Sequence, residues 1–312
     1  MNIAVAQGGG VDLIGDVHGC ASLLERLLER LDYHRGRDGV WRHAHRRALF
    51  LGDLIDRGPE IRETVELVRE MVAAGSAEAL LGNHEISALR AFLHPGGARV
   101  PRVHKATLEQ YSGHEAQWRD TLGWMLERPL CVEGERFRAV HACWDPSLVQ
   151  PFLASHPDGR IDHMMLERAS DPQSFFHQLF DRLTRGPQLR LPGARTITSH
   201  DGIERHSFRT SFWIPGPERY GDVVFQPDPL PDDLERRPLD ESAKRRLVSY
   251  GDDQPPLFVG HYWCRGVPAL IAANLACLDY SAVNGGALVA YRFDGERRLD
   301  ADRLVWIDAA RG

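Results

Sequence analysis

The sequence predicts an α/β fold that contains two β-sheets and a long insertion. Three observations support this prediction. Over residues 11–142, apolar runs of strand length alternate with amphipathic stretches of helical period. Residues 150–255 are rich in proline and charge and carry only weak strand signals. After them, four apolar runs follow one another with turns and without helices between them.

The first half has the order of a βαβαβ unit. Short apolar runs that end in a glycine indicate buried strands at 11–15, 47–52 and 78–82. Amphipathic patterns indicate helices over 20–32, over 60–74 and from His84 onward. Connections this short favour parallel strands with right-handed crossovers.

The remaining elements are predicted from weaker patterns. Residues 104–128 are expected to be largely helical, and 136–142 to form a strand that bears His141. Residues 150–255 are expected to be a cap-like insertion, or a set of long loops, within a single domain that spans 1–312. The last strands are expected at 257–261, 273–279, 286–293 and 303–308, and their direct succession favours an antiparallel second sheet.

Composition narrows the classes of function. The chain has 312 residues, 43% hydrophobic and 26% charged, as in ordinary globular proteins. Its net charge of -6 argues against a nucleic-acid partner. No apolar run approaches the roughly 20 residues that cross a membrane. Residues 1–10 do not resemble a secretory signal, so we expect a cytoplasmic protein, of open oligomeric state. Five scattered cysteines argue against a disulfide framework or a zinc–thiolate site.

Four short motifs place candidate metal ligands at strand ends, where open α/β sheets build their sites. The motifs are GDVHG at 15–19, GDLIDRG at 52–58, GNHE at 82–85 and GH at 260–261. With the strand-borne histidine, they supply the candidate ligands Asp16, His18, Asp53, Asn83, His141 and His261. Each of these residues alone is more often structural, but the set indicates a two-metal site that suits attack on phosphorus. Mixed nitrogen and oxygen ligands favour manganese, with iron, zinc, nickel, cobalt or magnesium as alternatives.

The motifs resemble those of the calcineurin-like metallophosphoesterase superfamily. The DRG and GNHE forms resemble its phosphoprotein phosphatase branch, and in particular bacterial Ser/Thr/Tyr phosphatases and diadenosine tetraphosphatases. The resemblance covers 11–145 and 257–293. It implies a two-sheet β-sandwich flanked by helices, with two metals at the strand ends between the sheets. Trp263 stands where the broader superfamily often has a second histidine. The phosphoprotein phosphatases also lack that histidine, so this difference favours their branch.

The resemblance also implies a role for each matching residue. Asp16, His18 and Asp53 would bind one metal, and Asp53, Asn83, His141 and His261 the other, with Asp53 bridging. A metal-bound hydroxide would attack phosphorus. Arg57 would bind the phosphate, His84 would be the general acid, and Asp56 would orient His84. A second phosphate-binding arginine is expected between 141 and 261, and Arg185, beside a Gly-Pro turn, is our candidate.

The substrate is less determined than the chemistry. We rank a phosphomonoester or phosphoprotein phosphatase of the Ser/Thr type narrowly first. The alternative is a dinucleoside polyphosphate hydrolase that cleaves diadenosine tetraphosphate. For the alternative, Trp144, Trp213, Tyr262 and Trp263 are candidates to stack on a base. A non-catalytic metal-binding scaffold is a third hypothesis, although no predicted ligand or acid is missing. Negative net charge argues against a nuclease.

Overall fold

Two β-sheets carry the motifs. The computed structural model describes residues 9–93, 100–198, 204–225 and 230–309. The larger sheet has the order β14-β15-β1-β4-β5, with β16 beside β15. Its strands are β1 (Gly10–Ile14), β4 (Arg46–Phe50), β5 (Ala77–Ala79), β14 (Asp279–Tyr280), β15 (Ala287–Phe293) and β16 (Leu304–Asp308). The smaller sheet, β13-β12-β7-β6, contains β6 (Cys131–Glu133), β7 (Arg138–Val140), β12 (Leu257–Val259) and β13 (Leu275–Cys277).

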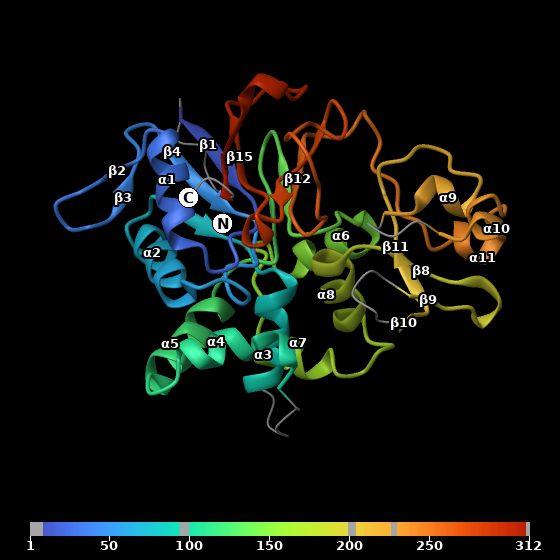
Figure 1. Cartoon of the computed structure of the whole chain (residues 1–312), viewed down its shortest axis with the longest axis horizontal. Helices are drawn as coiled ribbons and strands as arrows, with labels where there is room; N and C mark the ends of the chain where they lie inside the picture. Colours follow the sequence, from blue (N-terminus) through green and yellow to red (C-terminus); the bar gives the residue numbers. More distant parts are fainter. Residues whose placement is uncertain (1–8, 94–99, 199–203, 226–229, 310–312) are drawn as a thin grey trace. The chain divides into compact units, whose positions relative to one another are not determined.

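The βαβαβ prediction is confirmed. β1, β4 and β5 pair in parallel, and α1 (Ala21–Arg30) and α2 (Ile61–Ala73) connect them. The apolar stripe of α1 is buried together with that of α2. Both helices lie beside the strands of the larger sheet (Figure 1). The hairpin β2 (His34–Arg35) and β3 (Trp41–Arg42), between α1 and β4, was not predicted.

The prediction of one antiparallel sheet from the last strands is wrong. β12 pairs in parallel with both β7 and β13, whereas β15 pairs antiparallel with β1 and with β16 in the larger sheet. Two parallel strands need a connection of about a dozen residues or more, and residues 260–274 are long enough to provide it. The apolar pattern identified the strands but not their partners, because periodicity does not encode pairing direction.

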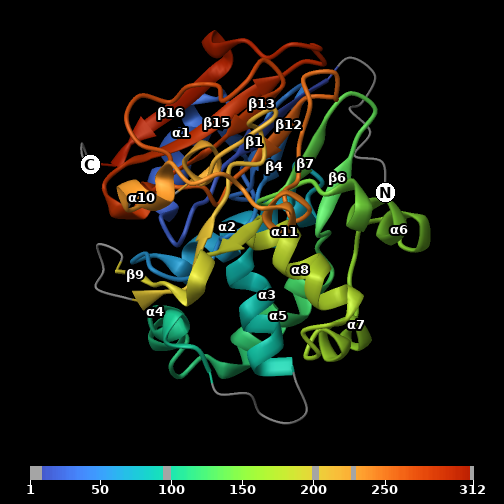
Figure 2. The same cartoon turned by 90° about the vertical axis from the view of Figure 1, so that its right-hand side faces the viewer.

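Strand residues alternate between two cores, as the two-residue period of a strand requires. Leu49 of β4 packs in the core between the sheets, where it joins Phe258 of β12. Phe50 faces the other way, into the core beneath α1 and α2. In Figure 2 the strands β15, β1 and β4 lie beside β13, β12 and β7. The chain therefore forms the predicted two-sheet sandwich with helices on its flank.

Further helices follow the sheet strands. They are α3 (Asn83–Leu93), the 3₁₀ turn η1 (Arg102–His104), α4 (Lys105–Gln110), α5 (Glu115–Leu126), α6 (Pro146–Ser155), α7 (His163–Arg168) and α8 (Phe175–Arg185). The helical prediction for 104–128 is confirmed by η1, α4 and α5. None of the helices in the described ranges is long and apolar enough to span a membrane.

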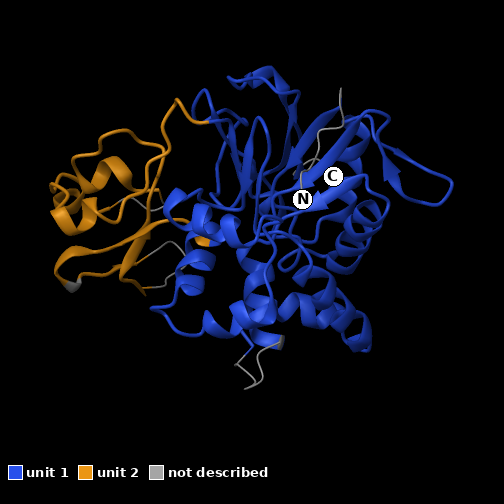
Figure 3. Ribbon diagram, turned by 180° about the vertical axis from the view of Figure 1, so that it is seen from behind, with its two compact units in different colours: residues 1–184, 255–312 blue, residues 185–254 orange. Residues whose placement is uncertain are grey.

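The chain divides into two compact units (Figure 3). One consists of residues 1–184 and 255–312, and the other of residues 185–254. The second unit contains β8 (Gln188–Arg190), β9 (Ile197–Thr198), β10 (Glu204–Arg205), β11 (Ser207–Arg209), α9 (Tyr220–Val223), α10 (Asp232–Glu235) and α11 (Glu241–Lys244). It has its own small apolar core. A single domain over 1–312 with an insertion at 150–255 stays a prediction.

Candidate metal centre and active site

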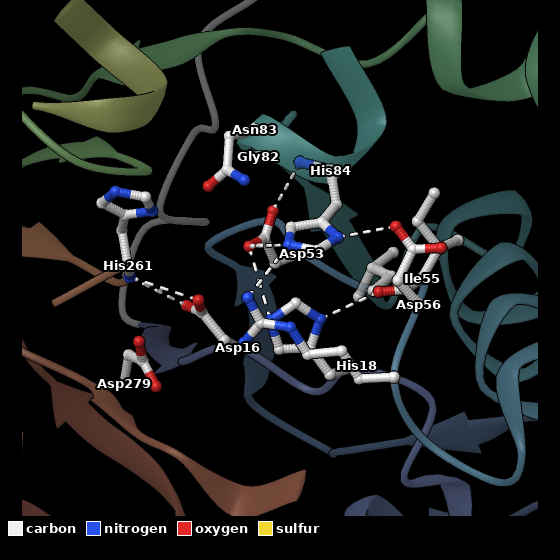
Figure 4. Close-up of polar contacts among 12 residues, drawn as sticks. Asp16, His18, Asp53, Ile55, Asp56, Gly82, Asn83, His84, His261 and Asp279 are labelled. Carbon is white, nitrogen blue, oxygen red and sulfur yellow. Dashed lines mark hydrogen bonds and ion pairs between the residues drawn. The ribbon is translucent and has the colours of Figure 1, made fainter. Parts of the chain in front are cut away.

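All six predicted metal ligands lie shortly after the ends of strands of the two sheets. Asp16 and His18 follow β1, Asp53 follows β4, Asn83 begins α3 after β5, His141 follows β7 and His261 follows β12. All but Asn83 are buried. Figure 4 shows side chains from these separate segments converging around Asp53.

The carboxylate of Asp53 lies between two imidazoles. Its Oδ2 is 3.5 Å from Nε2 of His18 and 3.4 Å from Nε2 of His141. Oδ1 of Asn83 is 3.2 Å from the same Nε2 of His141. The Asp53 carboxylate therefore lies between His18 on one side and His141 with Asn83 on the other. This is the position expected of the predicted bridging ligand.

Potential ligand atoms form two compact groups in the described part of the chain. His18, Asp53 and His84 form one group, and Asp53, His141 and His261 form the other. The ligand atoms within each group lie within 4.8 Å of one another. Asp53 belongs to both groups, which is the arrangement that two neighbouring cations require.

Asp16 joins the strand ends of the two sheets. Its carboxylate accepts hydrogen bonds from the backbone amide of His261, at 3.2 and 3.3 Å. Burial, and then the nearby charge of Asp279, raise the pKa of Asp16 well above its usual value. Asp279 is also buried, and the sequence analysis missed it. It follows the apolar run 275–278, so it carries the strand-end signal without the glycine.

The imidazole orientations fit cation ligands. Nδ1 of His18 donates to the carbonyl of Ile55 at 2.8 Å, and Nδ1 of His141 donates to the carbonyl of Leu51 at 2.7 Å. Burial lowers the pKa of His18 to about 3, so its Nε2 presents a lone pair to the Asp53 carboxylate. Two facing acceptors repel each other unless a cation lies between them. Backbone acceptors behind ligating histidines are typical of metal sites.

The surroundings of the His141 imidazole favour positive charge. Burial alone would lower the pKa of His141, but the carboxylates of Asp53 and Asp16 raise it to about 10. Either a proton or a metal cation satisfies these carboxylates. The donor set and its electrostatics therefore fit two divalent cations around Asp53.

The loops that carry these side chains hold strained backbone. His18, Asp53, Asp56, Arg57 and His261 all have positive φ, between 46° and 70°. Left-handed backbone costs about 1–3 kcal/mol at a non-glycine residue and clusters at functional sites. Two motif glycines allow the close packing: a Cβ on Gly82 would lie 2.1 Å from Oδ1 of Asp53, and a Cβ on Gly260 would lie 2.0 Å from Oδ1 of Asp16.

The buried carboxylate of Glu85 joins the loop after β4 to the GNHE loop at the start of α3. Its Oε2 accepts from the amides of Asp53 at 2.8 Å and Gly82 at 2.9 Å. Its Oε1 accepts from the amide of Leu54 at 2.9 Å. In the sequence, Glu85 is only the last residue of the GNHE motif, and no pattern marks its role. Its role depends on amides more than 25 residues away, such as that of Leu54, 31 residues earlier.

His84, Asp56 and Arg57 also come together. Nδ1 of His84 donates to Oδ2 of Asp56 at 2.6 Å, and its Nε2 lies 3.3 Å from a guanidinium nitrogen of Arg57. Burial would raise the pKa of Asp56, but hydrogen bonds from His104 and His84 lower it to about 2. Asp56 is thus a carboxylate, which leaves Nε2 of His84 directed toward Arg57 and Asp53.

Trp263 is the aromatic candidate whose ring faces Arg57. The Arg57 guanidinium lies 5.5 Å from the centroid of its ring, within the range of a cation–π contact. Trp144 and Tyr262 are fully buried and pack in the interior. Trp213 belongs to the unit of residues 185–254, as does Arg185, so the roles of both stay predictions.

Comparison with known proteins agrees with this geometry. Residues 11–189 match the family model of the calcineurin-like phosphoesterases. A Dechloromonas aromatica protein named bis(5'-nucleosyl)-tetraphosphatase, symmetrical, is 34% identical over 93% of this chain and 94% of its own length. A Paracidovorax citrulli protein of the same name is 39% identical over 46% of this chain, a match that spans only 47% of that relative.

A solved structure shows the same fold. A cold-active protein-tyrosine phosphatase of a psychrophilic Shewanella species aligns with a TM-score of 0.51 and 16% identity, over 93% of this chain and 80% of that one. At this identity the likeness concerns the fold alone. The family model and the full-length relative are more specific. The chain therefore belongs to the calcineurin-like phosphoesterase family, the metal-dependent hydrolases that its four strand-end motifs predict.

Proposed function

We propose that the chain hydrolyses dinucleoside polyphosphates such as diadenosine tetraphosphate. The observation that carries this proposal is the 34% identity, over 93% of the chain, to a relative named as a symmetrical bis(5'-nucleosyl)-tetraphosphatase. The phosphatase neighbour at 16% identity supports the fold but not a phosphoprotein substrate. The order of the two substrate hypotheses is therefore reversed relative to the sequence analysis, with phosphoprotein second.

The proposed cofactors are two divalent cations, with manganese first among them because of the mixed nitrogen and oxygen donors. The ligands we propose are Asp16, His18, Asp53, Asn83, His141 and His261. When bound, the two cations would supply an activated nucleophile and neutralise charge on the phosphoryl group. Nδ1 of His18 and Nδ1 of His141 each donate to a backbone carbonyl, and these hydrogen bonds keep both Nε2 atoms directed at Asp53.

Three side chains that are not proposed as metal ligands, those of Arg57, His84 and Asp56, would bind the phosphoryl group and deliver a proton. Arg57 presents its planar guanidinium beside Nε2 of His84, and this fork matches two phosphoryl oxygens. A proton on Nε2 of His84 would pass to the leaving oxygen. The Asp56 carboxylate, bonded to Nδ1 at 2.6 Å, stabilises the imidazolium that holds this proton. Arg185 stays a candidate second arginine for the longer phosphate chain.

The test is a substrate comparison after metal reconstitution. Chelated protein is reloaded with Mn²⁺, Zn²⁺ or Mg²⁺ and assayed on diadenosine tetraphosphate, a phosphoserine peptide and p-nitrophenyl phosphate. We expect the highest kcat/KM on the dinucleotide, with nucleoside diphosphate as the product of symmetrical cleavage. Faster turnover of the peptide would overturn the proposal in favour of a phosphoprotein phosphatase. Loss of activity in Asp53→Asn is the control that the turnover belongs to this site.

A further inference from the structure

We propose that His104 is a positioning residue that fixes Asp56 and, through it, His84; this inference rests on the proposed phosphoester hydrolysis. His104 lies in none of the motifs. It ends the 3₁₀ turn η1, directly before α4, and is completely buried. The sequence gives no sign of its role, because its partner Asp56 lies 48 residues earlier.

Asp56 is the centre of a buried network. Its Oδ2 accepts from Nδ1 of His84 at 2.6 Å and from Nδ1 of His104 at 2.8 Å. Thr107 donates its hydroxyl to Oδ1 and accepts the amide hydrogen of Asp56 at 3.1 Å. An ionised carboxylate can only accept, so both imidazoles carry their hydrogen on Nδ1. One carboxylate oxygen therefore sets the orientation of two histidines.

His104 is held at its other nitrogen as well. Its Nε2 lies 2.9 Å from the hydroxyl of Ser87, and Ser87 follows His84 by three residues on α3. Residues three apart on a helix lie on the same face. A closed circuit thus runs from His84 through Asp56 and His104 to Ser87 and back along α3. Figure 4 shows the part of this circuit that joins His84 to Asp56.

The circuit has a consequence for proton delivery. Without His104, Oδ2 of Asp56 keeps only the donor of His84, and Thr107 alone holds Oδ1, so two side-chain donors instead of three fix the carboxylate. A buried carboxylate with an unmet acceptor is unfavourable, so a rotated or hydrated arrangement becomes competitive. The ring of His84 then loses its fixed direction toward Arg57. The loss of the fixed His84 orientation should slow most strongly those reactions in which the leaving group needs a proton.

The first test is nuclear magnetic resonance of histidine-labelled protein, which needs no turnover. His104→Leu removes both polar contacts, and Ser87→Ala is the milder variant that loosens His104 if the leucine variant fails to fold. His177→Asn, which disturbs a histidine–carbonyl contact in α8, is the matched control. We expect the Nδ1–H signal of His84 to shift or exchange faster with water in the first two variants and to stay unchanged in the control. An unchanged His84 signal in both variants would overturn the inference.

The second test compares phenyl phosphate with 4-nitrophenyl phosphate, which differ by one nitro group and therefore in how much the leaving group needs a proton. We expect His104→Leu to lower kcat for phenyl phosphate by at least about tenfold more than for the nitrophenyl ester, a part of the usual general-acid contribution. His104→Asn, which keeps an N–H donor near Asp56, should recover much of this loss. Equal losses on both esters would indicate a merely structural residue. Inactivity of the unaltered protein on every phosphoester would instead contradict the proposed function.

Discussion

The backbone amide of His84 donates a hydrogen bond to Oδ1 of Asp53 at 3.0 Å. The two oxygens of Asp53 therefore have different surroundings: Oδ1 meets the N-terminus of α3, and Oδ2 faces the imidazoles of His18 and His141. A helix N-terminus favours negative charge. This hydrogen bond at the N-terminus of α3 consequently holds the proposed bridging ligand beside the proposed proton donor.

Asp53→Asn should lose both cations. The amide that replaces the carboxylate has one acceptor oxygen and no charge, so neither ligand group keeps its shared member. Elemental analysis after manganese loading and gel filtration measures the metal content. Asp38→Asn, in the exposed β2–β3 hairpin, is the control that should retain normal metal content. Two equivalents of metal in Asp53→Asn would refute the bridging assignment.

His84→Asn should lower kcat by about 10²–10⁴-fold, the usual contribution of general acid catalysis. None of the six proposed ligands is changed, so the metal content should stay close to that of the unaltered protein. Steady-state kinetics and elemental analysis on the same preparation separate the two effects. His177→Asn is the matched histidine control, because its contact is to the carbonyl of Ala169, the C-cap of α7, and not to any proposed ligand or to Asp56. Full turnover in His84→Asn would exclude it as the acid.

Arg57→Ala should mainly weaken the binding of phosphate and substrate. Loss of a charge-assisted contact costs about 2–4 kcal/mol, which corresponds to a large rise in the inhibition constant of inorganic phosphate. The ring of Trp263 also loses its cationic neighbour. Inhibition by phosphate, measured against the same substrate in both proteins, gives the change. Arg42→Ala, whose partner is Asp38 on the exposed hairpin, is the control, and equal inhibition in Arg57→Ala would remove its phosphate role.

Glu85→Ala should destabilise the metal loops. The substitution leaves the buried amides of Asp53, Leu54 and Gly82 without their acceptor. Each such group costs about 1–3 kcal/mol, so we expect the free energy of unfolding to fall by about 3 kcal/mol or more. Urea unfolding of the metal-free protein measures this change. Glu85→Gln keeps one acceptor oxygen, so its free energy of unfolding should lie between those of the unaltered protein and Glu85→Ala. An unaltered urea midpoint in Glu85→Ala would contradict the proposal that Glu85 joins the two loops.

The strand-end ligands were predictable from sequence, and their supporting residues were not. A buried apolar run, a glycine and a polar ligand form one continuous signal, which located Asp53, Asn83 and His261. Glu85 acts through a contact to an amide 31 residues earlier, and His104 through a contact to a carboxylate 48 residues earlier. Such contacts arise only once the chain is folded. The pairing of β12 with β7 was missed for the same reason.

The stability supplied by Asp56 should disappear at low pH. The hydrogen bonds from His104 and His84 outweigh burial and lower the pKa of Asp56 from 3.8 to about 2 in the folded protein. A lowered folded-state pKa stabilises the fold above the unfolded-state pKa, and this contribution is lost as the pH falls from about 4 to about 2. The shift corresponds to about 2 kcal/mol, of which about half is lost by pH 3. Urea unfolding of the chelated protein and of Asp56→Asn, at pH 6 and pH 3, isolates this contribution because the other carboxylates titrate in both proteins. We expect the difference in free energy of unfolding between them to narrow toward pH 3, and a constant difference would show that Asp56 has the same pKa folded and unfolded.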